Sequence, residues 1–140
     1  MRNRSPTETS RKDVSIILAE DDDELRFILA RMLTMEGYDV EEVSDVDSLA
    51  RRLADLKTQV DGMSPVRAVV SDNFLTGGTA LEVLESFEGG RNALPVILIT
   101  SVYDPEVVEK AKRLDVRAVL TKPVEMTELI RRLEECLADE

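Results

Sequence analysis

Ala68-Val69-Val70-Ser71-Asp72 decides the fold of this 140-residue chain, because an apolar run ends there in a carboxylate and a loop with Gly77-Gly78 follows it. Short apolar runs of this kind are typical of strands that are buried on both faces of a parallel sheet. Three other apolar runs also end in residues that carry chemistry, namely Glu20-Asp21-Asp22-Asp23, Thr100 and Lys122-Pro123. The carboxyl ends of parallel strands meet at one edge of a sheet, where ligands bind. We therefore expect carboxylates, a hydroxyl and an ammonium group to lie together at that edge.

Amphipathic segments alternate with the apolar runs and predict helices between the strands. In the first segment Gly37 ends the helix, and one helical face is predicted to carry Leu25, Ile28, Leu29, Met32 and Leu33. The second strand is expected near a sheet edge because it is rich in acidic residues; the five expected strands are 14–19, 38–43, 66–71, 95–100 and 116–121. Five such units with right-handed crossovers predict an α/β fold with a parallel sheet and helices on both faces. A Rossmann nucleotide-binding site is a poor alternative, because the first strand-to-helix turn is acidic rather than glycine-rich.

Capping residues predict where the later helices begin and end. Ser44-x-x-Asp47 resembles a capping box before the second helix. Thr79 is expected to cap a short third helix, which Gly89-Gly90 would end. Asp104-Pro105 places an N-cap and a proline at the first position of the fourth helix. The last helix is expected over residues 125–138.

Charge and composition exclude several classes of function. The net charge is −11 and no basic stripe is present, which argues against nucleic acid as a direct partner. The chain has no histidine, so histidine-based catalysis, zinc sites with histidine ligands and a role as phosphohistidine donor are excluded. No apolar stretch approaches the ~18 residues of a membrane span. The single cysteine, Cys136, stands at helical spacing among apolar residues, so it is expected in the core and fits a reducing compartment. We expect residues 1–13 to form a flexible tail, residues 14–140 to form one domain, and the protein to be cytoplasmic.

The acidic residues at the predicted sheet edge favour a divalent cation. Glu20 and Asp21 are expected beside Asp72, and carboxylates this close resist full ionisation unless a cation relieves their repulsion. Mg²⁺ prefers oxygen ligands and usually binds one or two carboxylates together with phosphate oxygens. A carboxylate can also act as a nucleophile and form an aspartyl phosphate, with Thr100 donating its hydroxyl to one phosphoryl oxygen and Lys122 offering its charge to another. Acidic residues at a helix start can instead be present only because they interact favourably with the helix dipole. The acidic residues taken alone therefore do not establish a metal site.

Taken together, these motifs resemble the receiver domains of response regulators in two-component signalling. The resemblance covers about residues 14–138 and rests on the segments 17–22, 69–72, 94–101 and 121–123. It implies a doubly wound, flavodoxin-like (βα)5 fold with five parallel strands in the order 2-1-3-4-5. It also implies that Asp72 accepts a phosphoryl group from the phosphohistidine of a sensor histidine kinase or a histidine phosphotransfer protein.

The resemblance implies a role for each residue around this phospho-acceptor. Asp21 and the acceptor would bind Mg²⁺ directly, Glu20 would bind it directly or through a water, and the backbone carbonyl of Phe74 would be a further ligand. Thr100 would move toward the phosphoryl group, and Lys122 would pair with it. The peptide bond between Lys122 and Pro123 would be cis.

Several positions depart from the family pattern. A proline, a glycine and an aromatic switch residue are common in the family where this chain has Thr76, Ala80 and Val119. Tyr103 is either a substitute for the missing aromatic residue or an ordinary exposed side chain. Phe74 and Val102 flank the path of a hydrolytic water, and we hypothesise that these apolar groups slow autodephosphorylation.

The predicted function is a stand-alone response regulator that signals by protein–protein contact or onward phosphorelay, with no enzymatic activity beyond its own phosphorylation and slow dephosphorylation. No output domain is expected, and the output face would comprise the last two helices and the strand between them. Phe27 lies off the apolar stripe of the first helix and is expected either to anchor the phosphodonor or to fold back on a neighbour. A phosphatase with Asp72 as transient nucleophile is a weaker alternative, because such enzymes want a second Asp where Phe74 stands. A non-phosphorylated adaptor stays open because of Val119.

Overall fold

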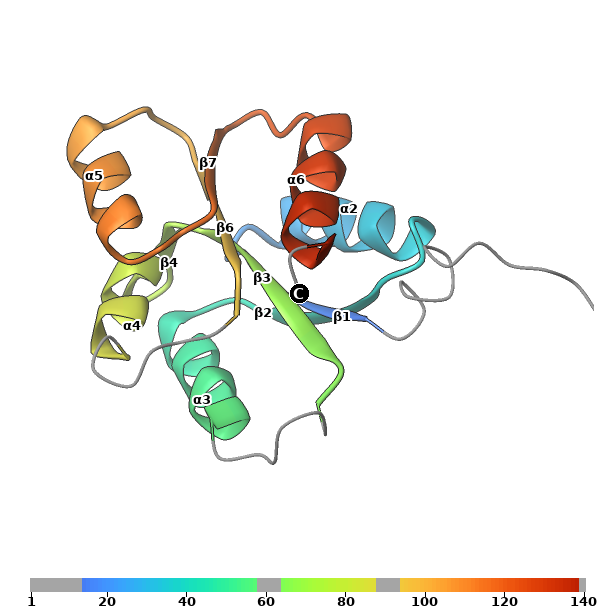
Figure 1. Cartoon of the computed structure of the whole chain (residues 1–140), viewed down its shortest axis with the longest axis horizontal. Coiled ribbons are helices and arrows are strands. Elements are labelled where there is room, and N and C mark those ends of the chain that lie inside the picture. The colour runs from blue at the N-terminus through green and yellow to red at the C-terminus, as the bar shows by residue number, and fades with distance from the viewer. Residues whose placement is uncertain (1–13, 58–63, 88–93, 139–140) are drawn as a thin grey trace, which may run out of the picture.

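The computed structural model describes residues 14–57, 64–87 and 94–138. The expected tail, residues 1–13, and the expected helix end at Gly89-Gly90 lie outside the described residues. Strands and helices alternate along the chain (Figure 1) as β1 (Ser15–Ala19), α2 (Asp23–Met35), β2 (Asp39–Val43), α3 (Val46–Lys57), β3 (Val66–Asp72), β4 (Phe74–Leu75), β5 (Gly78–Thr79), α4 (Ala80–Ser86), β6 (Val96–Thr100), α5 (Pro105–Arg113), β7 (Ala118–Thr121) and α6 (Met126–Ala138). Every expected strand and helix is present, with small differences at their ends. In the described part of the chain, no helix has the length and apolar character needed to cross a membrane.

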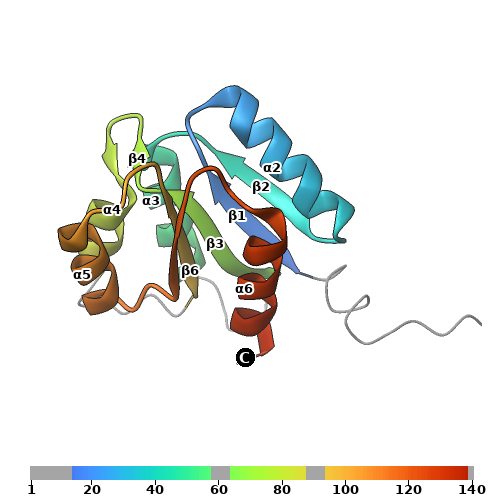
Figure 2. The ribbon, with the colours of Figure 1, turned by 90° about the horizontal axis from the view of Figure 1, so that it is seen from above.

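The main sheet has the order β2-β1-β3-β6-β7, and all neighbouring strands in it are parallel. This order confirms the expected 2-1-3-4-5 arrangement, since β6 and β7 are the fourth and fifth strands of the sheet in sequence. Helices α2 and α6 pack on one face of the sheet, and α3, α4 and α5 pack on the other (Figure 2). The interior strand β1 is buried along its whole length, as its apolar run predicted.

Strand β2 lies at one edge of the sheet, and all its residues are exposed or half-buried, which confirms its predicted edge position. Two arginines cover this acidic edge. Arg26 of α2 contacts Glu42, and Arg52 of α3 contacts Glu41. Paired charges on an edge strand also disfavour pairing with a strand of another molecule.

The predicted apolar face of α2 was partly wrong. Leu29 and Leu33 are buried, but Ile28 is 46% exposed and Met32 is 37% exposed, while Ala30 is buried. The helix is turned about its axis so that the face of Ala30 and Arg26 lies toward the protein. A small residue at that face lets the helix approach the sheet closely, and Arg26, one turn earlier, reaches the end of β1.

Of the helix caps predicted within the described residues, those at Gly37, Thr79 and Asp104 are confirmed and the one before α3 is wrong. The Asp45 carboxylate, not Ser44, accepts the hydrogen bond from the Ser48 amide, at 2.7 Å. The cap is shifted by one residue because Asp45 forms a bridge with Thr76, which lies beyond β3. Thr79 forms a full capping box with Glu82, Asp104 caps α5 with Pro105 in the first turn, and Gly37 ends α2 with φ 103°.

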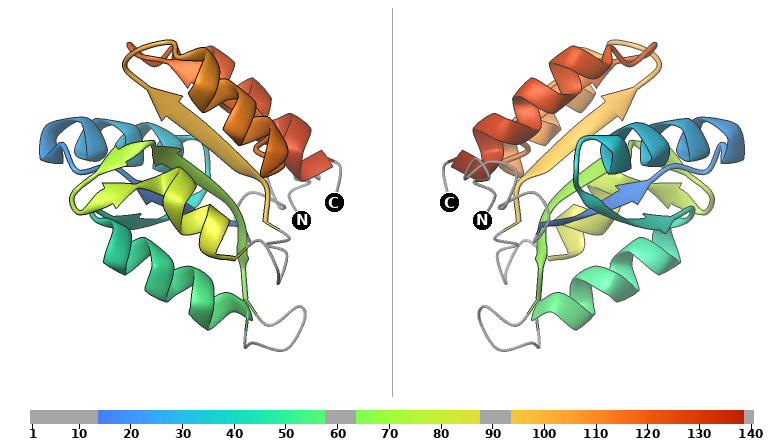
Figure 3. Two further views of the ribbon diagram at one scale, coloured as in Figure 1. Left: turned by 90° about the vertical axis from the view of Figure 1, so that its left-hand side faces the viewer. Right: turned by 90° about the vertical axis from the view of Figure 1, so that its right-hand side faces the viewer.

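The loop after Asp72 was not predicted in detail. It forms a small antiparallel hairpin in which β4 pairs with β5, seen in yellow-green between β3 and α4 in Figure 3. Gly77 adopts φ 95°, and a Cβ atom there would lie 2.9 Å from Cγ2 of Val46. Because both the conformation and the close contact disfavour any side chain, the glycine fixes this loop against the start of α3.

Candidate functional site

The four polar groups predicted at the sheet edge come from four strand ends. Asp72 is the last residue of β3, and Glu20 follows β1 directly. Thr100 ends β6, and Lys122 follows β7 directly. One carboxylate oxygen from each of Glu20, Asp21 and Asp72 lies within 4.8 Å of the others. The parallel sheet therefore brings three acidic side chains from two separated segments to one point.

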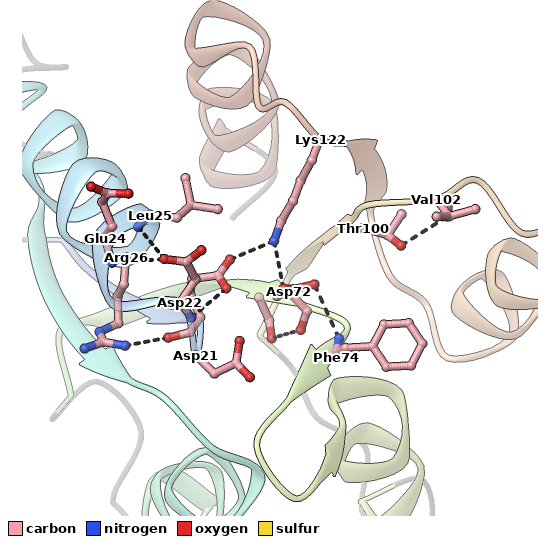
Figure 4. A network of polar contacts seen from close by, with 12 residues as sticks. Asp21, Asp22, Glu24, Leu25, Arg26, Asp72, Phe74, Thr100, Val102 and Lys122 are labelled. Atoms are coloured by element: carbon pink, nitrogen blue, oxygen red, sulfur yellow. Dashed lines mark hydrogen bonds and ion pairs between the residues drawn. The ribbon is translucent and has the colours of Figure 1, made fainter.

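Lys122 joins two of these carboxylates. Its Nζ donates a hydrogen bond of 2.9 Å to Oδ2 of Asp72 and lies 3.2 Å from Oε1 of Glu20 (Figure 4). Burial by itself lowers the pKa of Lys122, but the hydrogen bonds and charges of Asp72 and Glu20 outweigh this effect, and the pKa is raised. The Lys122–Pro123 peptide bond is cis, as expected.

Glu20 is almost completely buried, with 1% of its surface exposed. Burial raises its pKa, and the charge of Asp72 adds to this shift, against the hydrogen bond from the Asp22 amide and the attraction of Lys122. Oε2 accepts the Asp22 amide at 3.1 Å. Oε1 forms an ion pair of 3.2 Å with Lys122 and, within the described part of the chain, meets the geometry of no hydrogen bond. A buried carboxylate oxygen in this state is ready for a further positive partner.

The donor set fits Mg²⁺. Three carboxylates converge, all their ligand atoms are oxygen, and one lysine does not balance three negative charges. Asp72 and Glu20 would exchange part of their contact with Lys122 for contact with the ion. At Phe74, the backbone amide donates a 3.3 Å hydrogen bond to Oδ1 of Asp72, and the expected role of its carbonyl as a ligand stays a prediction.

Thr100 is buried at the same edge, but its hydroxyl is not directed at the acceptor. It donates a 3.1 Å hydrogen bond to the backbone carbonyl of Val102, as Figure 4 shows. Tyr103 is 65% exposed, as expected for an ordinary surface tyrosine. Val119 is half-buried against the core cluster that includes α5. The structure thus places Thr100 close to the site with its hydroxyl engaged elsewhere.

Two residues that contact the acidic loop were not found from the sequence. The Arg26 guanidinium donates to the backbone carbonyl of Glu20 at 2.8 Å. The Thr76 hydroxyl lies 3.4 Å from Oδ2 of Asp21, in a weak hydrogen bond. The only sequence signal for Arg26 was its position three residues after Asp23 on a helix, which is common on solvated helix faces. Thr76 was noted only as a departure from the family pattern, and its contact with Asp21 was not predicted because it depends on how the loop after β3 folds.

Comparisons with known proteins match this chain to a family model and to curated relatives. The family model described as "Response regulator receiver domain" matches residues 16–134. The chain is 31% identical over 120 residues to "Response regulator RppA" of Synechocystis sp., covering 84% of this chain and 48% of that protein. It is 30% identical over 125 residues to "DNA-binding transcriptional regulator NtrC" of Rhizobium meliloti, covering 89% of this chain and 24% of that protein. The chain therefore spans about half or less of the length of these two curated relatives.

Solved structures share the fold. A CheY-like response regulator receiver domain protein from Methanospirillum hungatei aligns with a TM-score of 0.75 and 21% identity, covering 90% of this chain and 94% of that one. A LuxR-family response regulator from Staphylococcus aureus aligns with a TM-score of 0.74 and 24% identity, covering 88% of this chain and 98% of that one. At these identities the likeness concerns the fold alone.

Proposed function

Because the chain belongs to the response regulator receiver domain family of two-component signalling, we propose that it is a Mg²⁺-dependent phospho-acceptor whose acceptor is Asp72. The donor is the phosphohistidine of a sensor histidine kinase or of a histidine phosphotransfer protein. The observation that supports this most directly is the convergence of Glu20, Asp21, Asp72 and Lys122 at one sheet edge. The expected cytoplasmic location is part of this proposal.

Transfer would proceed by attack of an Asp72 carboxylate oxygen on the phosphorus atom. The new bond is the O–P bond of an acyl phosphate, the P–N bond to the donor breaks, and the imidazole nitrogen of the donor keeps the electron pair. Glu20, Asp21 and Asp72, with the Phe74 carbonyl, would hold the ion, which would supply positive charge next to the transferring group. Nζ of Lys122 already lies 2.9 Å from Oδ2 of Asp72 and would donate to a phosphoryl oxygen after transfer.

Thr100 provides a response to phosphorylation. Its hydroxyl now donates to Val102, and a phosphoryl oxygen on Asp72 would be a stronger, charged acceptor. Turning the hydroxyl to that oxygen would release the Val102 carbonyl and change the loop between β6 and α5. We propose α5, β7 and α6 as the output face, which would contact a downstream protein or serve onward phosphorelay.

The phosphodonor is proposed to dock on α2. Phe27 is 63% exposed and Met35 is 75% exposed, together with the exposed parts of Ile28 and Met32. The exposure of Phe27 agrees with its predicted position off the buried stripe. Large apolar side chains on a helix beside an acceptor site suit a helical partner that presents a histidine, because aromatic and methionine side chains are frequent anchors of interfaces.

The proposal is tested by incubation with acetyl phosphate and Mg²⁺, followed by intact mass measurement. The wild type should gain the mass of one phosphoryl group only when Mg²⁺ is present. Asp72→Asn should gain nothing, and Asp47→Asn, which changes an exposed carboxylate on α3, should behave as the wild type. Absence of any labelling would favour the non-phosphorylated adaptor. Repeated turnover of a generic phosphate ester would favour the phosphatase.

A further inference from the structure

We propose that Arg26 is a positioning residue for the Mg²⁺ site, because its guanidinium fixes the backbone of the loop that carries Glu20 and Asp21. This inference rests on the proposed function. Arg26 itself contributes no oxygen ligand and would not touch the ion. Its action on the site would pass through the peptide group that joins Glu20 to Asp21.

Arg26 contacts the peptide group between Glu20 and Asp21, which directly precedes the Cα atom of Asp21. Nη1 of Arg26 donates to the carbonyl oxygen of Glu20 at 2.8 Å. The amide of Glu20 is held on its other side, where it donates to the carbonyl of Val43 on β2 at 3.1 Å. After Glu20 the chain leaves the sheet, so the hydrogen bond from Arg26 restrains the orientation of the next peptide plane. A rotation of that plane would carry the Asp21 carboxylate away from Asp72.

The guanidinium is itself fixed from two further directions. Nη2 donates to Asp23 at 2.7 Å, and Nε donates to Glu42 on the edge strand at 3.2 Å. The Arg26 side chain is only 19% exposed. A planar fork with donors in three directions suits this task, whereas a lysine ammonium at the same place has no such fixed geometry.

The charge of Arg26 and its positioning role predict opposite changes in Mg²⁺ affinity when Arg26 is replaced. Arg26 is positive, so its removal leaves Asp23 and Glu42 unbalanced and makes the surroundings of the acidic loop more negative. By Coulomb's law this change would strengthen the binding of a divalent cation. Positioning predicts weaker binding, because a loop that samples several orientations must be ordered again when the ion binds. The sign of the change in Mg²⁺ affinity therefore separates the two effects.

Arg52 offers a matched control. It is also an arginine on a helix, it is 28% exposed, and it contacts the neighbouring glutamate of the same edge strand, Glu41. Nε and Nη2 of Arg52 both donate to the carboxylate of Glu41, not to the acidic loop. Replacing Arg52 thus removes a comparable ion pair from β2 and leaves the peptide after Glu20 untouched.

The experiment is isothermal titration of Mg²⁺ into the full chain, carried out for wild type, Arg26→Met, Arg26→Lys and Arg52→Met, with thermal unfolding in EDTA to establish that each variant folds. Loss of an outer partner of a metal site typically weakens binding 10–100-fold. We expect a dissociation constant for Arg26→Met about tenfold above that of the wild type, because the action is through the backbone. The dissociation constant of Arg26→Lys should be close to that of Arg26→Met, and that of Arg52→Met should equal the wild-type value.

Each outcome decides the inference. Equal or tighter Mg²⁺ binding by folded Arg26→Met would overturn it, and so would an equal loss in Arg52→Met. Full restoration by Arg26→Lys would show that a single ammonium donor is enough and that the fixed geometry of the guanidinium is not needed, and would also overturn the inference. If Arg26→Met does not fold, Arg26→Lys and Glu42→Met, which removes the acceptor of the Arg26 Nε on β2, carry the test; both should bind Mg²⁺ more weakly than the wild type, and unchanged binding in both would overturn the inference. A wild type that binds no Mg²⁺ would instead refute the proposed function, on which this inference rests.

Discussion

Replacing Lys122 by methionine should destabilise the metal-free protein and make Mg²⁺ restore most of that stability. Lys122 donates a 2.9 Å hydrogen bond to Asp72 and lies 3.2 Å from Glu20, while both carboxylates are buried. Methionine keeps the length and the apolar stem of the side chain but removes the charge. Two carboxylates would then face each other across the site with Asp21 beside them and no cation.

The size of the loss follows from these contacts. A hydrogen bond to a charged group contributes about 1.5–3 kcal/mol. Because the Lys122 side chain is 20% exposed, solvent screens part of its interaction, and the repulsion released between the carboxylates adds to the loss. We expect a free energy of unfolding lower by about 2–3 kcal/mol in total. For a domain of this size that corresponds to a fall in Tm of roughly 10 °C.

The assay is thermal unfolding near neutral pH, in EDTA and again in saturating Mg²⁺. Mg²⁺ should raise the Tm of Lys122→Met more than that of the wild type, because the ion no longer competes with the ammonium group. A ligand at a hundred times its dissociation constant stabilises by about 2.7 kcal/mol, which is enough to offset the expected loss. Lys110→Met is the control, since Lys110 forms a partly exposed ion pair of 3.0 Å with Glu85 on α4, and such pairs contribute about 0–1 kcal/mol. The reasoning is refuted if Lys122→Met unfolds in EDTA at the temperature of Lys110→Met, or if Mg²⁺ stabilises it no more than the wild type.

Three further substitutions test other parts of the site. Phe74→Asn replaces a 63% exposed apolar side chain beside Asp72 with a polar one, so the acyl phosphate should decay several-fold faster, and an unchanged decay rate would contradict a shielding role. Phe27→Ala should slow transfer from the protein donor about tenfold and leave labelling by acetyl phosphate unchanged; equal losses with both donors would exclude Phe27 as a docking residue. Glu20→Gln tests the pH dependence of stability. Burial and the charge of Asp72 raise the pKa of Glu20 above 4.5. Protonation of Glu20 therefore stabilises the metal-free wild type below pH 4.5, and this stability is lost as the pH rises through the raised pKa. The variant should therefore have the higher Tm in EDTA near neutral pH and an equal Tm near about pH 4, and an equal Tm at both pH values would show that ionised Glu20 is not strained.

Much of the fold could be predicted because its signals are local. Most strands were predicted from short apolar runs. Most helix starts were predicted from capping residues such as Thr79 and Asp104, and both signals depend on neighbours in the chain. The prediction was weaker for α2, where Ile28 and Met32 were expected inside and are exposed. Helical spacing identifies an apolar face, but the rotation of the helix depends on what the sheet presents to it. Here Ala30 and Arg26 set that rotation through contacts with the core and the end of β1.

The cap of α3 and the loop after Asp72 show a second limit. Ser44 and Asp45 are both good capping residues, and the bridge from Asp45 to Thr76 decides between them. Those two residues come from segments that meet only when the sheet forms. In the same way the close approach of Val46 to Gly77 explains a glycine that the sequence alone placed only in a loop.

At the site, the sequence by itself determined which side chains stand at the strand ends, because polar residues that interrupt apolar runs are visible in one dimension. Glu20, Asp21, Asp72 and Lys122 were all expected there, and the structure brings them together. Only the tertiary structure decided that Lys122 bridges two carboxylates, that the Thr100 hydroxyl is engaged by Val102, and that Arg26 holds the peptide after Glu20. These facts depend on distances between segments far apart in the chain. Such distances are fixed by how the helices pack on the sheet, and no local pattern of residues records them.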